Sequence, residues 1–446
     1  MRFKPWIPRA AFKISLGEQS RLFLVVTGLI GSAYARFVLK LCRIKLEGRE
    51  RLIEEYRLSV ADKSRFIIAY RHPGDADPHL VYHMLTNLLR SDAPATAPDG
   101  RPGAWYPSGT EVQLWASPLI LWALKNAGIV PVRHGGVDRT VMDFLVQGVA
   151  HRKRPMAIAP EGQSTYHQNL LPELDPGTVR IAMLAAERLA NEGTPLPVRI
   201  VPLSIDYRYG RTTTPTHLDR FIARLERRVA RPGESLPARS GDREAIQARL
   251  MAIWERLVSA TESAYARAWG IKSAPVGANL CERTLTLIDQ SIARLEGFYG
   301  VVPAGNLKAR ILNIRAESLR RVFYEAGELA AFSSLEQGMA NRGSAEAYFL
   351  DQVYLVAGLG QFLDPAYIDG ESSFDRLVET AQNLFDYANR LEGMNMGHRP
   401  RPFLKDATLI VGKPIDVARG PGENRRQAAD RLQRELEDGL KTLIRG

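Results

Sequence analysis

Cysteine is nearly absent from the 446-residue chain, which contains only Cys42 and Cys281. Two cysteines so far apart exclude a disulfide framework, match no metal-binding spacing and are typical of a protein with reduced thiols. Internal repeats, low-complexity tracts and recognised nucleic-acid-binding motifs are also absent, so nucleic acid is not an expected partner despite the net charge of +11. The composition is that of a globular protein, and the length suffices for about two to three domains.

The N-terminal apolar run is too short to cross a bilayer. It extends over fourteen residues, from Leu22 to Ala35. As a helix it would measure about 20 Å, whereas the hydrocarbon core is roughly 30 Å thick. Residues 1–45 also contain nine Lys or Arg residues and only one acidic residue. We therefore predict a helix, or a helix pair, within residues 1–45 that lies in a membrane interface with its cations near anionic headgroups.

This prediction implies a peripheral or monotopic protein on the cytoplasmic face of a membrane, with the lipid surface as a partner. Two other interpretations stay open. Ala33-Tyr34-Ala35 matches the cleavage signal of a secretory peptide, although the leader before it is long. The apolar run is also compatible with an ordinary helix buried in a core.

The first two hundred residues alternate short apolar runs with helical patterns, which predicts an α/β domain. The expected strands are 65–70, 128–133 and 198–209, and the expected helices include 78–90, 137–152 and 177–193. Beyond these, long periodic segments rich in Arg, Glu, Leu and Ala predict a helical region that extends to about residue 400. Residues 407–417 again have the pattern of a strand and a turn.

The stretch "AYRHPGDADPH" (69–79) concentrates the polar residues of greatest chemical interest. His72 follows an apolar strand, in the connection where α/β folds place reactive groups. A tight turn through Pro73-Gly74 would return the Asp77 carboxylate to the His72 imidazole. Such a carboxylate fixes the tautomer and leaves the other ring nitrogen as a general base. Asp77 also precedes Pro78, a favoured way to cap and begin a helix.

A metal site is an alternative interpretation of the same stretch. Its ligands would come from His72, Asp75, Asp77, His79 and His83, and it would indicate a metal-dependent hydrolase. However, "HLVYH" lacks the glutamate of the H-E-x-x-H motif, and no other histidine-rich cluster lies nearby. We therefore predict no metal ligands, with Asp75, His79 and His83 as ordinary residues.

Three further short motifs follow His72-x4-Asp77 in order: "GIVPVRHGGVDR", "IAPEGQST" and "VRIVPLSI". Together the four blocks resemble those of the glycerolipid acyltransferase superfamily, whose best-known members are 1-acyl-glycerol-3-phosphate acyltransferases. The matching residues are His72 and Asp77 in the first block, Gly128 and Arg133 in the second, Pro160, Glu161 and Gly162 in the third, and Val201 and Pro202 in the fourth. The resemblance covers residues from about 45 to 210.

The resemblance implies transfer of a fatty acyl group from acyl-CoA or an acyl carrier protein to a hydroxyl of a lysolipid acceptor, with no metal and no cofactor besides the thioester co-substrate. His72 would be the general base and Asp77 its orienting carboxylate. Glu161 would position the acceptor, and backbone amides near Gly162 would stabilise the oxyanion. Arg133 would contact a phosphate.

The sequence departs from the family pattern at three positions. Arg71 and Gly74 stand where the family commonly has Asn and Ser, and Ser164 replaces the arginine that the family associates with the acceptor's phosphate. Arg71 and Arg133 are the substitutes that we expect for this phosphate contact, and the acceptor's identity stays open. The same departures motivate an alternative function, a non-catalytic lipid-binding protein on the membrane surface with a degenerate acyltransferase domain.

The resemblance also implies the domain organisation. In this family a strand of the type i-x-x-G-x-P-I closely follows the fourth block, but here "LIVGKPIDV" occurs at 409–417. We therefore expect a mixed sheet flanked by helices with a large all-α insertion, divided into 1–45 (membrane-interface segment), 46–215 (first part of the α/β domain), 216–400 (insertion) and 401–446 (closing strand and helix). The insertion would be a bundle with a solvated face, a cap over the acyl channel, a dimer interface, or a docking surface for an acidic acyl carrier protein.

Overall fold

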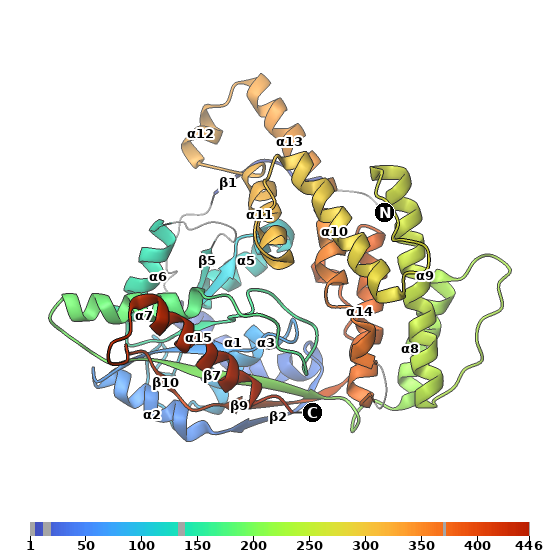
Figure 1. Cartoon of the computed structure of the whole chain (residues 1–446). Coiled ribbons are helices and arrows are strands. Elements are labelled where there is room, and N and C mark those ends of the chain that lie inside the picture. Colours follow the sequence, from blue (N-terminus) through green and yellow to red (C-terminus); the bar gives the residue numbers. More distant parts are fainter. Residues whose placement is uncertain (1–4, 12–18, 133–138, 369–371, 446) are drawn as a thin grey trace.

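The computed structural model describes residues 5–11, 19–132, 139–368 and 372–445 (Figure 1). A mixed sheet with the strand order β2-β9-β7-β3-β6 lies at its centre. These strands are β2 (Leu41–Glu47), β3 (Arg65–Tyr70), β6 (Met156–Ile158), β7 (Val198–Arg208) and β9 (Lys405–Val411). β3 is parallel to both β6 and β7, whereas β9 is antiparallel to β7 and parallel to β2. The predicted α/β fold with a mixed sheet flanked by helices is thus confirmed.

Helices cover both faces of this sheet, because successive side chains of each strand point to opposite sides. On β3, Ile67 and Ala69 pack on one face, whereas Phe66, Ile68 and Tyr70 pack on the other. The first face is covered by α6 (Arg139–His151), α7 (Gly177–Asn191) and α15 (Arg425–Lys441). The opposite face carries α1 (Arg21–Phe37), α2 (Arg49–Val60) and α3 (Asp77–His83), which continues into the π-helical turn η1 (Met84–Leu88).

Two short parallel strands extend this architecture beyond β6. They are β4 (Tyr106–Gly109) and β5 (Ile129–Val132), with the helices α4 (Val112–Trp115) and α5 (Pro118–Asn126) between them. Trp105, immediately before β4, is buried and forms an isolated parallel bridge with Met156 of β6. β5, where the second block begins, is therefore linked to the edge of the main sheet through β4.

The segment between β7 and β9 is predominantly helical, as expected from the sequence. Its helices are α8 (Pro215–Val229), α9 (Arg243–Trp269), α10 (Leu280–Tyr299), α11 (Leu307–Arg320), α12 (Ala326–Ala331), α13 (Ser334–Gly360) and α14 (Phe374–Leu391), with the short 3-10 turns η2 (Pro365–Ile368) and η3 (Met396–His398). Two short strands, β1 (Arg9–Ala10) and β8 (Phe323–Tyr324), pair beside α12. Since β9 follows these helices yet lies between β2 and β7, the residues on either side of the helical segment share one sheet. The domain boundaries themselves stay predictions.

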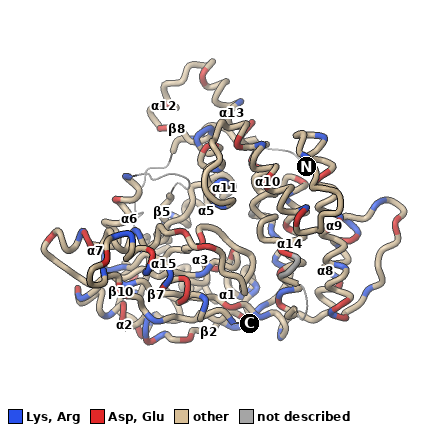
Figure 2. Tube along the Cα trace, viewed as in Figure 1, with Lys and Arg blue, Asp and Glu red and all other residues tan. Residues whose placement is uncertain are grey.

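Cations and carboxylates alternate along these helices (Figure 2), and many pair across them. Arg249 of α9 binds Glu226 of α8 at 2.7 Å, and Arg310 of α11 binds Glu296 of α10 at 2.8 Å. These ion pairs between neighbouring helices explain part of the arginine content, as expected for a helical bundle. The cap, dimer and carrier-protein interpretations stay predictions.

The N-terminal segment differs from the prediction in its second half. Residues 41–47 form the strand β2, which pairs with β9 from its first residue to its last, and not a second helix. The reason lies in the alternation of the sequence: Arg43 and Lys45 are exposed, whereas Ile44 and Leu46 pack against the core, which is the period of a strand. Within the described ranges, no helix combines the length and the apolar character needed to cross a membrane.

A last short strand pairs antiparallel with β7. β10 (Ile415–Asp416) pairs with the beginning of β7, and α15 then packs against α7 and β7. The expected closing strand, turn and helix thus occur at the C-terminal end of the described chain.

Candidate active site

The first and third sequence blocks meet because β3 and β6 are neighbouring parallel strands, with Ile68 opposite Ala157. The carboxyl ends of parallel strands lie at the same edge of a sheet, so the loops after β3 and β6 come together there. The loops are joined directly, since the Thr165 amide donates a hydrogen bond to the His72 carbonyl at 2.9 Å. This junction brings the residues of the first and third blocks together.

The His72 imidazole and the Asp77 carboxylate form a close pair. Nδ1 of His72 lies 3.0 Å from Oδ2 of Asp77. The Gly74 amide donates to the same oxygen at 2.6 Å, and the Tyr207 hydroxyl donates to Oδ1. The Asp77 side chain is fully buried, whereas that of His72 is 16% exposed. A buried, multiply anchored carboxylate therefore fixes the ring and leaves Nε2 for chemistry.

The predicted capping role of Asp77 is wrong. α3 begins at Asp77 after Ala76, and no side chain caps its first turn. The physical reason is that the carboxylate faces back toward His72, Gly74 and Tyr207, which together engage both of its oxygens.

Opposing effects act on the pKa of His72. Burial lowers this pKa, but the hydrogen bond and charge of Asp77, followed by the charges of Glu161 and Asp75, outweigh burial and raise it above its ordinary value of 6.5. Burial and the Asp77 charge raise the pKa of Tyr207 well above 10.0, so this phenol stays protonated as a donor. Tyr207 was not identified from the sequence.

Ser164 completes a line of three side chains. Its Oγ lies 3.0 Å from Nε2 of His72, on the opposite side of the ring from Asp77. From the sequence, Ser164 is notable only because it replaces an arginine of the family pattern. In the structure its hydroxyl occupies the position at which a general base would receive a proton.

Glu161 holds the backbone at His72. Its Oε2 accepts a hydrogen bond from the His72 amide at 2.8 Å, and its Oε1 accepts one from Nε of Arg71 at 3.1 Å. Burial raises the pKa of Glu161, and the Arg71 charge opposes this rise. Glu161 therefore orients the loop that follows β3 in this structure, while its expected contact with an acceptor stays a prediction.

Arg71 is placed differently from a substrate-binding arginine. Its side chain is fully buried, and its guanidinium binds Glu161 together with the carbonyls of Gln168 and Leu170. Arg71 thus ties the third-block loop to the end of β3. The predicted phosphate contact receives no support from this arrangement, because the donors of the guanidinium face the protein.

Gly162 has a left-handed backbone with a φ of 73°, which favours glycine at this position. Its amide donates to the Ala159 carbonyl at 3.1 Å and closes a turn. This particular amide is therefore not directed at an oxyanion, and the expected role of neighbouring amides stays a prediction. Arg133 lies outside the described residues.

The residues of the alternative metal interpretation have other neighbours. Asp75 forms an ion pair with Arg401 at 2.6 Å, and the rings of His79 and Tyr34 lie 5.6 Å apart. In the part of the chain that the structure describes, no three His, Cys, Asp or Glu side chains are grouped to hold a metal ion.

Helical-segment residues enclose the third-block loop, which the sequence could not reveal because they lie far away along the chain. Asn383 of α14 donates to the Tyr166 carbonyl at 3.2 Å, and the Arg399 guanidinium lies 3.9 Å from the centre of the Tyr166 ring. Lys308 of α11 donates to the Glu173 carbonyl at 3.2 Å. The site is thus built by the α/β part and the helical part together.

Comparison with known proteins agrees with the order of the blocks. Residues 43–206 match the family model described as Acyltransferase. A search of curated proteins found no match. The matched range contains β2, β3 and β6, most of β7, and both loops of the site. The expected resemblance to the glycerolipid acyltransferase family is therefore confirmed over residues 43–206, which match an acyltransferase domain.

Proposed function

We propose that this protein transfers a fatty acyl group from acyl-CoA or acyl-ACP to a hydroxyl of a lysolipid or a related glycerolipid, with His72 as the general base and Asp77 as its orienting carboxylate. The observation that carries the proposal is the geometry of His72. One ring nitrogen is anchored by a buried carboxylate at 3.0 Å, and the other faces a hydroxyl oxygen at 3.0 Å.

The proposed reaction needs no covalent enzyme intermediate. Nε2 of His72 takes the proton of the acceptor hydroxyl as its oxygen attacks the thioester carbonyl carbon. The new C–O ester bond forms, the C–S bond breaks, and the imidazolium returns the proton to the leaving thiolate. Asp77 stabilises the imidazolium between these steps. Proton transfer by a positioned base typically contributes about 10²–10⁴-fold to the rate.

The acceptor hydroxyl has to take the position of the Ser164 hydroxyl, so Ser164 must rotate away from His72 when substrate binds. The same contact favours a second mechanism, in which Ser164 itself attacks the thioester, carries the acyl group as an ester and passes it to the acceptor. In that case the thiol would be released before the acceptor binds. The two mechanisms use the same His72 and Asp77.

Acyl transfer itself is the test of the proposed activity. The purified chain is incubated with radiolabelled oleoyl-CoA or oleoyl-ACP and a panel of lysolipids and long-chain alcohols, and the labelled esters are separated. We expect a labelled ester with at least one donor and acceptor. If every combination yields none, the non-catalytic lipid-binding alternative is favoured.

The raised pKa of His72 predicts the pH dependence. A general base must be neutral, so the rate should fall as the pH decreases through a value above 6.5. In Asp77→Asn the hydrogen bond to a charged carboxylate is lost while burial still lowers the pKa of His72. The acid limb of kcat/KM should therefore shift to lower pH, and the plateau should decrease. An acid limb that does not move in Asp77→Asn contradicts the assigned pair.

An exposed apolar surface formed by α1 and α5 supports the proposed location at a lipid surface. Its exposed apolar side chains are Leu22, Val26, Leu29, Ile30 and Phe37 of α1 and Leu119, Ile120 and Trp122 of α5. The helices meet where the Phe23 and Trp122 rings contact edge to face, with their centres 5.4 Å apart. Exposed cations adjoin the apolar residues at Arg21, Arg36 and Lys125. Apolar area combined with flanking cations suits the interface of an anionic bilayer.

This surface lies close to the site, because α1 packs against α3, the helix that begins at Asp77. The Thr27 and Tyr82 hydroxyls are 2.7 Å apart across this contact. The proposed lipid-facing surface is therefore adjacent to the helix that carries Asp77.

We expect Leu29→Glu to weaken binding to vesicles that contain anionic lipid by about tenfold or more, because a leucine leaves the apolar phase and a negative charge is introduced. Leu335→Glu is a matched control, since Leu335 on α13 is 74% exposed and Leu29 is 73% exposed. Co-sedimentation with phosphatidylcholine–phosphatidylglycerol vesicles measures both. Equal losses in the two variants would contradict the assignment of this surface.

A further inference from the structure

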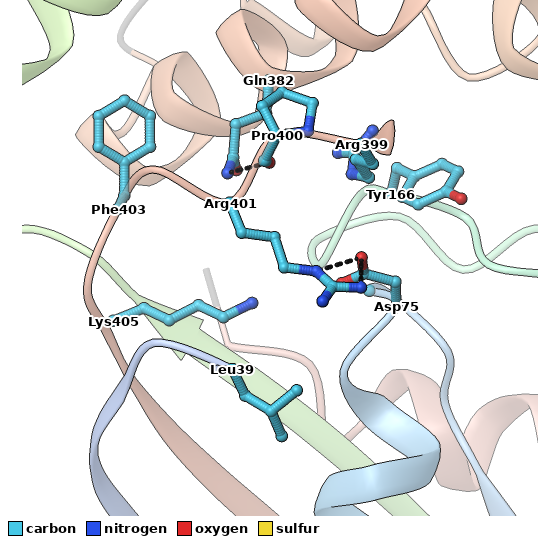
Figure 3. A pocket seen from close by; sticks show the side chains of 10 residues that line it. Leu39, Asp75, Tyr166, Gln382, Arg399, Pro400, Arg401, Phe403 and Lys405 are labelled. Carbon is cyan, nitrogen blue, oxygen red and sulfur yellow. Dashed lines mark hydrogen bonds and ion pairs between the residues drawn. The ribbon is translucent and has the colours of Figure 1, made fainter. Parts of the chain in front are cut away.

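A pocket adjoins both loops of the candidate site. Gly74 and Asp75 line it from the His72–Asp77 loop, and Tyr166 lines it from the third-block loop. The remaining lining residues are Leu39, Gln382, Arg399, Pro400, Arg401, Phe403 and Lys405 (Figure 3). Five of these belong to the segment that returns from the helical region into β9, which lies outside the matched range 43–206.

The pocket contains more positive than negative charge. Three cations line it, Arg399, Arg401 and Lys405, against one carboxylate, Asp75. Arg401 is paired with Asp75 at 2.6 Å. Arg399 is paired outside the lining, with Asp386 at 3.2 Å.

Lys405 has no such partner. Its ammonium rests on the Tyr207 ring, 3.6 Å from the ring centre, and no described carboxylate forms an ion pair with it. In Figure 3 its side chain points into the pocket toward Arg401 and Asp75. Burial is the largest influence on Lys405, and it lowers the pKa of this ammonium. The charges of Asp75, Asp77 and Glu379 act on this ammonium, but none of these carboxylates forms a close ion pair with it. A partly buried cation in this setting is stabilised when an anion binds directly beside it.

We propose that Lys405, Arg401 and Arg399 form the binding site for a phosphate group of the lipid acceptor, in place of the arginine that Ser164 replaces. This inference rests on the proposed function for its choice of ligand. Lys405 supplies a point charge with free donors, and Arg401 exchanges part of its contact with Asp75 for the phosphate. The acceptor site is thereby completed by residues about two hundred positions beyond the matched acyltransferase domain.

The first test measures binding without turnover. In the His72→Ala background, calorimetric titration with glycerol 3-phosphate is compared with titration with glycerol. We expect glycerol 3-phosphate to bind and glycerol not to bind. Lys405→Gln should weaken the binding of glycerol 3-phosphate about tenfold or more, because a charge-assisted hydrogen bond is lost. Asp75→Asn should instead bind more tightly, because the competing carboxylate is neutralised. Lys413→Gln, at an exposed lysine after β9, is the control and should bind unchanged.

The second test uses turnover in the otherwise unaltered chain. Lys405→Gln should raise the KM for lysophosphatidate about tenfold while the KM for monoacylglycerol stays the same. Arg401→Gln should act in the same direction, and its half-exposed side chain makes it the second variant if Lys405→Gln does not fold. If the KM for acyl-CoA rises but that for an acyl-pantetheine does not, the site holds a donor phosphate and the acceptor assignment is overturned.

The outcomes separate the site from the reaction. If glycerol 3-phosphate binding depends on Lys405 but the chain transfers no acyl group to any acceptor, the anion site is supported and the proposed reaction is contradicted. Acyl transfer with equal KM changes for lysophosphatidate and monoacylglycerol overturns the anion site and leaves the reaction intact.

Discussion

His72→Ala is expected to lower the rate of acyl transfer by about 10²–10⁴-fold, the usual contribution of a positioned general base. In the proposed mechanism, the variant removes the group that takes the acceptor's proton and returns it to the leaving thiolate. The remaining rate would come from substrates that are still bound side by side. The quantity to measure is kcat/KM with a fixed thioester and the best acceptor.

The fold should tolerate this change, since Asp77 keeps its hydrogen bonds from Gly74 and Tyr207. Unchanged circular dichroism of His72→Ala would establish this. His79→Ala is the informative companion variant. The proposed mechanism expects activity within about threefold of the wild type, because catalytic contributions come from groups that touch the reacting atoms, whereas the metal interpretation expects losses as large as those of His72→Ala. A His72→Ala variant with wild-type activity would refute the assigned base.

Arg71→Met is expected to destabilise the protein by about 3–5 kcal/mol, the range for breaking a buried ion pair by removal of one partner. The change leaves the Glu161 carboxylate buried without its guanidinium and removes donors to the Gln168 and Leu170 carbonyls. The loops that hold His72 should then separate, so activity and stability decrease together. Urea denaturation followed by tryptophan fluorescence measures the free energy of unfolding.

Two further variants test the cause of this loss. Glu161→Gln added to Arg71→Met should restore part of the stability, because no unpaired charge is then buried. Arg342→Met should change the free energy by only about 0.5 kcal/mol or less, since its pair with Glu346 lies on the surface and its side chain is 84% exposed. An Arg71→Met variant as stable as Arg342→Met would show that the Arg71–Glu161 pair is not needed to hold the loops.

Local features of the fold were predictable from the sequence. The apolar run 65–70 is β3 with the predicted bounds, and the helix predicted at 177–193 is α7 (Gly177–Asn191). The prediction for residues 41–47 was wrong because their basic residues also fit an amphipathic membrane helix, whereas their strand-like alternation is satisfied by pairing with β9. That pairing joins residues more than three hundred and fifty positions apart.

In the candidate site too, some contacts were predictable from the sequence and others were not. The approach of Asp77 to His72 follows from a five-residue separation and a Pro-Gly turn, so the sequence contained it. Tyr207 could not be found in this way, because its position depends on the register of β7 against β3. Tyr70, the last residue of β3, lies opposite Leu203, so Tyr207 extends past the end of β3 and over the following loop. The position of Lys405 beside the site could not be predicted either, because it depends on β9, which joins the sheet only after the whole helical segment.

The most direct measurement of the central claim follows thiol release and ester formation together, in the first turnover and at steady state. With acyl-CoA alone we predict no release of thiol. With the acceptor added, we predict one thiol for each ester formed, and both products formed about 10²–10⁴-fold more slowly in His72→Ala. A burst of thiol equal to the enzyme concentration without acceptor would contradict direct transfer and indicate an acyl group on Ser164. Continued thiol release without ester would contradict a transferase altogether.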